Sequence, residues 1–254
     1  LARLPKSNHG FETDQSFRIC CSRYANDCLC EKGHCSSDYK PGMMNALKEW
    51  ATVVNALENG DQTVLLRKGG IQEDSSGFMV GDKRSRFFLF PTFEHQEKKH
   101  IKPEFHKHLD NALSNKPSDG FNMLDCWARV VYENNIHSED TINELSRFHI
   151  LSDSYVKERI EWLPEKPMKV LFLKVYKVPG FEIPVLPEYN GCKSWIDLQE
   201  WEGQDASNSR LLIESIENND AVLIHEKLDA KIEEFSDIVG GTPLSGKNGW
   251  TDVY

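Results

Sequence analysis

The chain lacks an apolar run long enough to cross a bilayer. Its longest such stretch, Val170–Val175, is interrupted by Lys174, whereas a membrane helix needs roughly 20 apolar residues in a row. An N-terminal apolar segment typical of a secretory signal peptide is also missing. We therefore predict no membrane partner.

The seven cysteines do not form a regular disulfide pattern. Their number is odd, and all but Cys126 and Cys192 lie before residue 36. Disulfide-rich secreted domains carry an even and regularly spaced set, so we expect a reducing compartment. A zinc knot is conceivable, but the spacing matches no common pattern. It would use Cys21, Cys28, Cys30 and Cys35. We predict neither a metal nor a cofactor.

The net charge of −10 is unevenly distributed. Residues 197–254 carry 13 acidic and four basic side chains, a net charge of −9, whereas residues 1–196 are nearly neutral. An acidic region repels phosphate, which argues against nonspecific duplex binding by this part of the chain. The middle of the chain is left open to anionic ligands.

Residues 1–41 are predicted to be a disordered leader or a targeting extension. They lack periodicity and end in the turn-forming pair Pro41-Gly42. The stretch Phe17–Ser22 is similar to the end of a plastid transit peptide. Transit peptides are poor in acidic residues, however, and residues 1–41 contain five of them. We expect the chloroplast stroma, or otherwise another reducing intracellular compartment. The first residue is Leu, which leads us to expect a fragment or a processed chain.

Residues 42–200 are predicted to form a globular α+β domain, followed by an acidic helical extension and a loose tail over residues 201–254. The Asn59-Gly60 pair is typical of a hairpin turn, so we expect strands over residues 50–57 and 62–67 on either side of it. Further strands are expected over residues 87–90, where Pro91 should end the strand, and over residues 126–132 and 169–178. The regular alternation of a parallel sheet is missing, which favours a mostly antiparallel, curved sheet or a partial barrel.

Helices are expected between these strands. Residues 103–114 and 153–162 have helical apolar spacing, and Ser138 is a plausible N-cap for a third helix. In the acidic extension, Ile224, Leu228, Ile232 and Phe235 fit one helix face.

A first candidate site follows the strand that ends near residue 67. Arg67 and Lys68 stand beside Gly69 and Gly70. Glycine allows close backbone approach and exposed N–H groups bind anions, while arginine matches phosphate geometry. The pattern is not a P-loop, because its lysine and hydroxyl spacing is absent. A plain strand end with solvated cations is the alternative.

A second candidate site follows the strand that ends near residue 90. Glu94, His95 and Gln96 could supply a general base or hydrogen-bond a base edge. Two metal-dependent alternatives stay open. One is a trio of His95, His106 and His108, although two residues of separation turn the last two apart on a helix. The other is a nuclease-like pair, Glu97 and Lys99.

Near the end of the domain, Lys193 and Trp195 could contact phosphate and stack on a base, although Trp195 could equally be a core residue. Arg147, His149, Glu158 and Arg159 are more simply explained by an internal ion pair or helix-end hydrogen bonds. Cys192 has no nearby histidine in sequence to activate it. We expect Arg67, Glu94, His95 and Lys193 to converge on one concave surface.

Several of these segments resemble, in order, an uncharacterised family, one of the domains of unknown function of prokaryotes with plant plastid members. The resemblance covers about residues 45–200. It is carried by six segments: Lys48–Trp50, Leu65–Ile71, Phe88–Gln96, Arg147–Ile150, Glu158-Arg159 and Gly191–Leu198. It implies no activity, so no catalytic residue carries over from it.

The residues favour a binding module for a nucleotide or RNA. Its contacts would be Arg67, Lys68, Gly69, Gly70, Glu94, His95, Gln96, Lys193 and Trp195. A metal-dependent nuclease or hydrolase, using Glu94, His95, Glu97 and Lys99, is the alternative. A structural protein-interaction domain that uses the acidic C-terminal region is a third hypothesis. Whether the chain is an enzyme stays open.

Overall fold

The computed structural model describes residues 44–68, 86–191, 193–198, 221–241 and 244. The chain is divided after Gly42, and all the described residues belong to the second unit, Met43–Tyr254. The predicted leader and its cysteines lie outside the described residues, as do Gly69, Gly70 and Cys192. No helix among the described residues is long and apolar enough to span a membrane.

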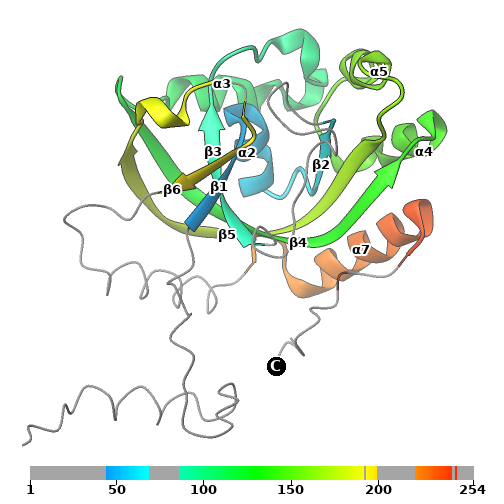
Figure 1. Cartoon of the computed structure of the whole chain (residues 1–254). Helices are drawn as coiled ribbons and strands as arrows, with labels where there is room; N and C mark the ends of the chain where they lie inside the picture. The colour runs from blue at the N-terminus through cyan, green and yellow to red at the C-terminus, as the bar shows by residue number, and fades with distance from the viewer. Residues whose placement is uncertain (1–43, 69–85, 192, 199–220, 242–243, 245–254) are drawn as a thin grey trace, which may run out of the picture. The chain divides into compact units, whose positions relative to one another are not determined.

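The second unit is built on one six-stranded sheet with the order β2-β5-β4-β3-β1-β6. The strands are β1 (Met44–Trp50), β2 (Val64–Arg67), β3 (Arg86–Thr92), β4 (Phe121–Ile136), β5 (Met168–Pro184) and β6 (Trp195–Leu198). Only β1 and β3 pair in parallel, and the other four neighbouring pairs are antiparallel. The sheet is open, mixed and strongly curved (Figure 1). The predicted α+β class with a curved, mostly antiparallel sheet is confirmed.

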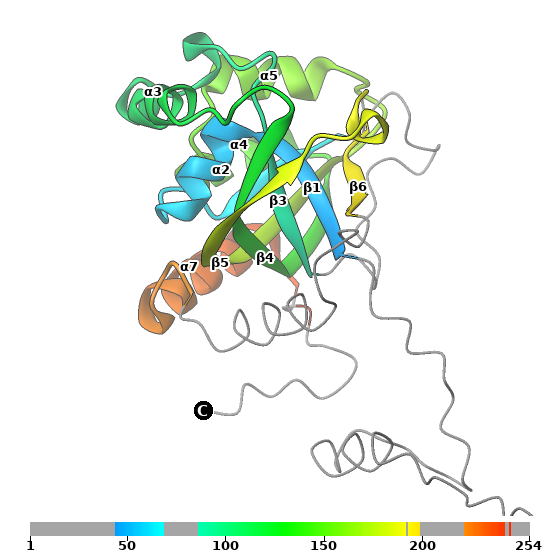
Figure 2. The ribbon, with the colours of Figure 1, turned by 90° about the vertical axis from the view of Figure 1, so that its left-hand side faces the viewer.

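Within the described residues, five α-helices accompany this sheet: α2 (Ala51–Glu58), α3 (His106–Ser114), α4 (Glu139–Glu144), α5 (Asp153–Glu161) and α7 (His225–Val239). Figure 1 shows α2 inside the curve of the sheet, where its side chains join the main core. In both views α7 lies at the end of the unit opposite α3 and α5 (Figure 2).

The predicted hairpin around Asn59-Gly60 is wrong. Residues 44–50 form strand β1 and residues 51–58 form helix α2, while β2 pairs with β5 rather than with its predecessor in the chain. The helix is buried on nearly every side, so its sequence carries no helical stripe of polar residues. Gly60, with a φ of 74°, instead ends the helix, since its N–H and that of Asp61 bond to carbonyls of the last turn.

The other predicted elements are found, with two changes in length. Strand β3 continues through Pro91. Beyond Phe88 this strand pairs with β1 and no longer with β4. Proline, which has no N–H, therefore interrupts no hydrogen bond between β3 and β4. Strands β4 and β5 are longer than predicted and pair with each other along most of their length. Ser138 caps α4 as predicted, with its hydroxyl accepting from the Thr141 N–H.

Helix α7 packs on the core through the predicted face. Leu228 and Phe235 are buried, and the Phe235 ring lies 5.1 Å from Phe172 and 5.8 Å from Phe148. Ile224, at the helix start, is 60% exposed. The division of the chain at residue 200 stays a prediction, since residues 199–220 lie outside the described residues.

One buried group gives the fold a testable pH dependence. His149 is 2% exposed, and neither ring nitrogen has a hydrogen-bond partner among the described residues. Burial, with help from the Lys102 charge, lowers the pKa of His149 to about 3. The folded state therefore holds His149 neutral. Its contribution to stability is present above the unfolded pKa of roughly 6.5 and is lost as the pH falls toward 3.

We predict that replacing His149 with Phe removes this dependence. As the pH falls from 6.5 to 4.5, the unfolding free energy of the wild type should drop relative to His149→Phe by up to about 1.4 kcal/mol per pH unit. Urea unfolding of both proteins at each pH measures the difference. His137→Phe, at an exposed position, is the matched control. A difference that stays constant with pH would contradict a neutral buried imidazole.

A second group, Asp125, changes the stability with pH in the opposite direction to His149. The pH dependence of the wild type alone therefore does not isolate His149, and a comparison with a variant is needed. Burial and the nearby Glu58 charge raise the pKa of Asp125 to about 6. The stability that this protonated carboxyl contributes is present below roughly 3.8 and is lost as the pH rises through about 6. Because Asp125 is present in both proteins, its contribution cancels in the difference.

Candidate functional site

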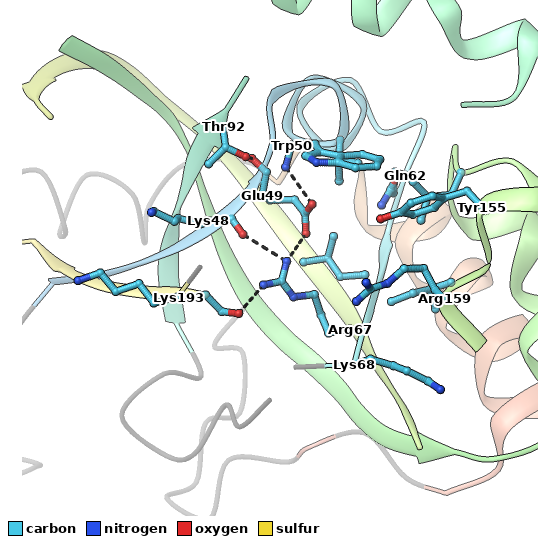
Figure 3. A pocket seen from close by; sticks show the side chains of 15 residues that line it. Lys48, Glu49, Trp50, Gln62, Arg67, Lys68, Thr92, Tyr155, Arg159 and Lys193 are labelled. Atoms are coloured by element: carbon cyan, nitrogen blue, oxygen red, sulfur yellow. Dashed lines mark hydrogen bonds and ion pairs between the residues drawn. The ribbon is translucent and has the colours of Figure 1, made fainter. Parts of the chain in front are cut away.

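A cavity of about 340 Å³ lies where the end of β1, strand β2, helix α5 and the segment before β6 meet. Figure 3 shows the side chains that line it. Five of them are cationic and one is a carboxylate, Glu49. The cations are Lys48, Arg67, Lys68, Arg159 and Lys193.

Arg67, the last residue of β2, ties the walls of the cavity together. Its Nη1 donates to Glu49 Oε2 at 2.9 Å and to the Lys48 carbonyl at 3.3 Å. Its Nη2 donates to Ser194 Oγ at 2.7 Å. These bonds join β2 to β1 and to the residue before β6, across the open side of the sheet. The Arg67 and Glu49 side chains are 18% and 13% exposed, so the pair is only partly screened by solvent.

Glu49 stands at the junction between β1 and α2, where the chain changes from strand to helix. Its second oxygen, Oε1, accepts from the Trp50 N–H at 2.9 Å. Thr52, in the first turn of α2, donates two hydrogen bonds to Gln96. Its N–H and its hydroxyl lie 3.1 and 2.7 Å from Gln96 Oε1. Gln96 is therefore occupied in fixing the start of α2 and does not line the cavity.

Helix α5 presents Tyr155 and Arg159 to the cavity, four residues apart and thus on one helix face. Ser152 caps this helix. In Figure 3 the Tyr155 hydroxyl and the Arg159 guanidinium point toward the Arg67–Glu49 pair. Among the described residues neither group has a hydrogen bond or an ion pair, whereas the Arg159 guanidinium lies over the Trp162 ring at 4.6 Å.

Burial at the cavity destabilises the charged forms of Arg159 and Tyr155. Burial is the largest cause that lowers the pKa of Arg159. The Arg67 charge adds to it, while Tyr155 and Glu49 oppose it without reversing the direction. Burial also raises the pKa of Tyr155, which keeps its hydroxyl a hydrogen-bond donor. The cavity thus contains two donors whose acceptors the described protein does not supply.

An aromatic wall closes the cavity beside these donors. The Trp50 ring lies 5.0 Å from Tyr155 and stacks on His100 at 5.5 Å with an interplanar angle of 18°. Rings of this size offer a face on which a base can stack.

Lys68 lines the cavity but has a structural task. Its Nζ donates to the carbonyls of Ile160, Trp162 and Leu163 at 2.6, 2.9 and 3.0 Å, at the carboxyl end of α5. An ammonium has three protons to donate, so all of them are used. The side chain extends away from the centre of the cavity in Figure 3. We therefore leave Lys68 out of the proposed ligand contacts.

The remaining predicted site residues are found in three settings. Lys193 lines the cavity, on the side away from α5 in Figure 3. Trp195 is buried, with its ring edge-on to Phe87 at 5.1 Å, which is the core position that we had kept as its alternative. Glu94 and His95 are exposed in the loop after β3 and do not line the cavity. Of the four residues expected to converge, only Arg67 and Lys193 share it.

The histidine trio is not brought together. His108 is buried between Asn55 Oδ1 and Asp61 Oδ2, at 2.8 and 2.9 Å, while His106 Nε2 lies 3.0 Å from the Lys98 carbonyl. Glu97 and Lys99 form an exposed ion pair with each other.

The described residues contain one group of potential metal ligands, Glu58, Asp125 and Cys126, with donor atoms within 4.8 Å of one another. Lys177 lies 3.3 Å from Glu58, and burial raises the pKa of the Cys126 thiol. Both conditions disfavour a bound cation.

Sequence reasoning missed five residues of the cavity: Lys48, Glu49, Trp50, Tyr155 and Arg159. Arg159 had been assigned to an internal ion pair or to helix-end hydrogen bonds, and among the described residues it forms neither. The first three end β1, whereas the strand was expected to begin only at residue 50, so their position at a strand end was hidden. The signal for Tyr155 was its spacing of four residues from Arg159 on a predicted helix, which places both side chains on one helix face.

A model of the family described as "Domain of unknown function (DUF1802)" matches residues 46–214. The chain belongs to this family. The resemblance found in the sequence is thereby confirmed, and the DUF1802 match includes every described residue of the cavity. A search of curated proteins gives no match.

Solved structures similar to this DUF1802 chain include ASCH from Zymomonas mobilis, at 11% identity and a TM-score of 0.36, covering 68% of this chain and 94% of that chain. Two single-residue variants of the same protein also match, at 10% and 12% identity with TM-scores of 0.35 and 0.33. They too cover 68% of this chain, and 96% and 97% of theirs. These similarities are too low to transfer a ligand or a residue role.

We predict that Arg67 is required for stability. Arg67→Met should lower the unfolding free energy by about 2–4 kcal/mol, because it leaves Glu49 partly buried without its cation. Arg67→Lys should be destabilising as well, since a single ammonium cannot span three acceptors held in a fork. Chemical denaturation measures both.

The control is Arg147→Met, which removes an exposed ion pair with Glu234 and should cost less than about 1 kcal/mol. Adding Glu49→Gln to Arg67→Met completes a double-mutant cycle, and the two losses should be clearly less than additive. Additive losses, or an Arg67→Met protein as stable as the wild type, would show that the pair does not hold the walls together.

Proposed function

We propose that the chain is a binding module for a nucleotide or an RNA strand, with the cavity between β1, β2 and α5 as its binding site. The observation that carries this proposal is Arg159, a half-buried guanidinium at the cavity with no carboxylate partner among the described residues.

The cost of placing Arg159 there is the core of the argument. The guanidinium is partly desolvated, and the repulsion from Arg67 and the attraction to Glu49 act on it together, so that burial remains the main cost. A charge in such a position is normally paired. Stacking on Trp162 fixes the plane of the group and leaves its N–H edge for an acceptor. An anionic ligand with two oxygens, such as phosphate, supplies the missing partner.

The other walls suit the rest of a nucleotide. Trp50 and Tyr155 supply aromatic surface beside the cationic groups, and bases stack on such rings at a gain of about 1–3 kcal/mol each. A volume of about 340 Å³ is within the usual range for small-ligand pockets. A plastid location remains part of the proposal and rests on the sequence of residues 17–22 alone.

We predict that Arg159→Gln weakens RNA binding by roughly 10–100-fold, the loss expected for a hydrogen bond to a charged group. Fluorescence anisotropy with labelled single-stranded RNA, run at several salt concentrations, measures the affinity. Arg147→Gln is the matched control, because it removes the same charge from a position outside the cavity. Circular dichroism shows whether each variant remains folded.

Two results would contradict the proposal. Equal losses in Arg159→Gln and Arg147→Gln would mean that only net charge matters and that the cavity is not the site. Cleavage of the RNA with magnesium or manganese, abolished by Glu97→Gln but not by Arg159→Gln, would instead favour the metal-dependent nuclease.

A further inference from the structure

Helix α5 is followed by a strained turn. Leu163, two residues after the helix ends, has a φ of 53°, in the left-handed region that residues other than glycine rarely adopt. The next residue is Pro164, and a residue before proline normally takes an extended backbone instead. Strain of this kind persists only where the surrounding structure holds it, and it is concentrated at ligand-binding and catalytic sites. The turn therefore needs a group that fixes it.

Lys68 is that group. It is 5% exposed, and its ammonium donates to the carbonyls of Ile160, Trp162 and Leu163. The last carbonyls of a helix have no partner within the helix, so a single cation satisfies three acceptors of this turn, the strained residue included. The ammonium has as many protons as acceptors, and none is left for a ligand.

The same turn carries the ring on which Arg159 stacks. The Arg159 guanidinium lies 4.6 Å from the centre of the Trp162 ring, three residues further along the chain. The Trp162 N–H bonds to the Glu158 carbonyl and the Trp162 carbonyl accepts from Lys68, so the main chain that carries the ring is held on both sides. Because the guanidinium packs over this ring, the position of Trp162 restricts where the Arg159 N–H groups point.

Lys68 directly follows Arg67 in the chain, and these two cations fix different walls of the cavity. Arg67 bonds to β1 and to the residue before β6, whereas Lys68 bonds to the end of α5. In Figure 3 the two side chains leave the end of β2 in different directions. The end of β2 therefore sets the position of both walls.

We infer that Lys68 is a positioning residue of this site: by fixing the turn after α5 it holds Trp162, and through Trp162 it orients the Arg159 guanidinium in the cavity. This inference rests on the proposed function of the same site. It gives Lys68, which contacts no ligand, an effect on ligand affinity, and it assigns that effect to a single route. Lys68 should affect binding only while Arg159 is present.

The test is a double-mutant cycle on RNA affinity, measured with the full chain by fluorescence anisotropy of labelled single-stranded RNA. Lys68→Met should weaken binding at least roughly fivefold. In the Arg159→Gln background the same change should cost less than about twofold, because the group that Lys68 positions is then missing. Circular dichroism at the temperature of the titration shows whether each variant is folded.

The matched control is Lys102→Met. Lys102 is another lysine whose ammonium donates to main-chain carbonyls, those of Ser146 and His149, and it does not line the cavity. This change should lower the stability and leave the RNA affinity within about twofold of the wild type. A loss of affinity as large as that of Lys68→Met would contradict a specific positioning role, because any lost lysine contact would then have the same effect.

Trp162→Leu tests the same route through a second residue and decides the matter if Lys68→Met does not fold. It keeps the main-chain carbonyl that Lys68 binds and removes only the ring under Arg159. We expect a loss of roughly fivefold or more in RNA affinity, and less than about twofold in the Arg159→Gln background. Wild-type affinity in Trp162→Leu would show that the stack does not orient Arg159.

The inference and the proposed function fail separately. If Arg159→Gln weakens RNA binding and folded Lys68→Met does not, the positioning role is wrong and the binding site stands. The same holds if Lys68→Met costs as much without Arg159 as with it, since Lys68 would then act on the RNA by its own charge or through the fold as a whole. If Arg159→Gln leaves RNA binding unchanged, the proposed function is wrong and the inference falls with it.

Discussion

The guanidinium of Arg67 joins the two ends of the open sheet. Strands β2 and β6 are the two outer strands, so no ladder of backbone hydrogen bonds connects them. Arg67 at the end of β2 bonds to Glu49 and the Lys48 carbonyl on β1, and to Ser194 just before β6. Arginine presents its donors in a rigid planar fork, and here two nitrogens of that fork reach three acceptors on separate segments. The cavity exists because this side chain sets the distance between its walls.

The same ion pair determines what the cavity can bind. Glu49 cancels the charge of Arg67 and is itself held by the Trp50 N–H, so the pair forms a nearly neutral floor. The attraction for an anion then comes from Arg159 on α5, which is partly desolvated and forms no ion pair among the described residues. Structural and ligand-binding cations are thus separated within one site, with Arg67 and Lys68 used by the fold and Arg159 left for a ligand.

The strands that the sequence predicted are those whose composition favours an extended backbone. Residues 169–178 and 126–132 are rich in β-branched and aromatic side chains, and they lie in the longest strand pair of the sheet, β5 and β4. Helix α2 was missed because it is enclosed by the sheet and is therefore apolar on most sides, which is the pattern of a buried strand as much as of a helix. That single error also displaced β1.

The sequence predicted those site residues that lie at charged strand ends. It did not predict the contacts between segments that are far apart in the chain. Arg67 and Lys193 were found because each follows or precedes an apolar strand. Nothing in the sequence around Lys68 indicates that its ammonium meets the end of α5, more than 90 residues away in the chain. Tyr155 and Trp50 meet only because β1 and α5 pack together, so their pairing is a property of the tertiary structure.

The most direct test of the account is a crystal structure of the chain with adenosine 5′-monophosphate. We expect the phosphate between the Arg159 guanidinium and the Tyr155 hydroxyl, with hydrogen bonds of about 2.7–2.9 Å, and the Arg67–Glu49 pair unbroken beneath it. A nucleotide bound elsewhere on the chain, or a phosphate that displaces Glu49 from Arg67, would contradict the division between the cation that holds the fold and the cation that binds the ligand.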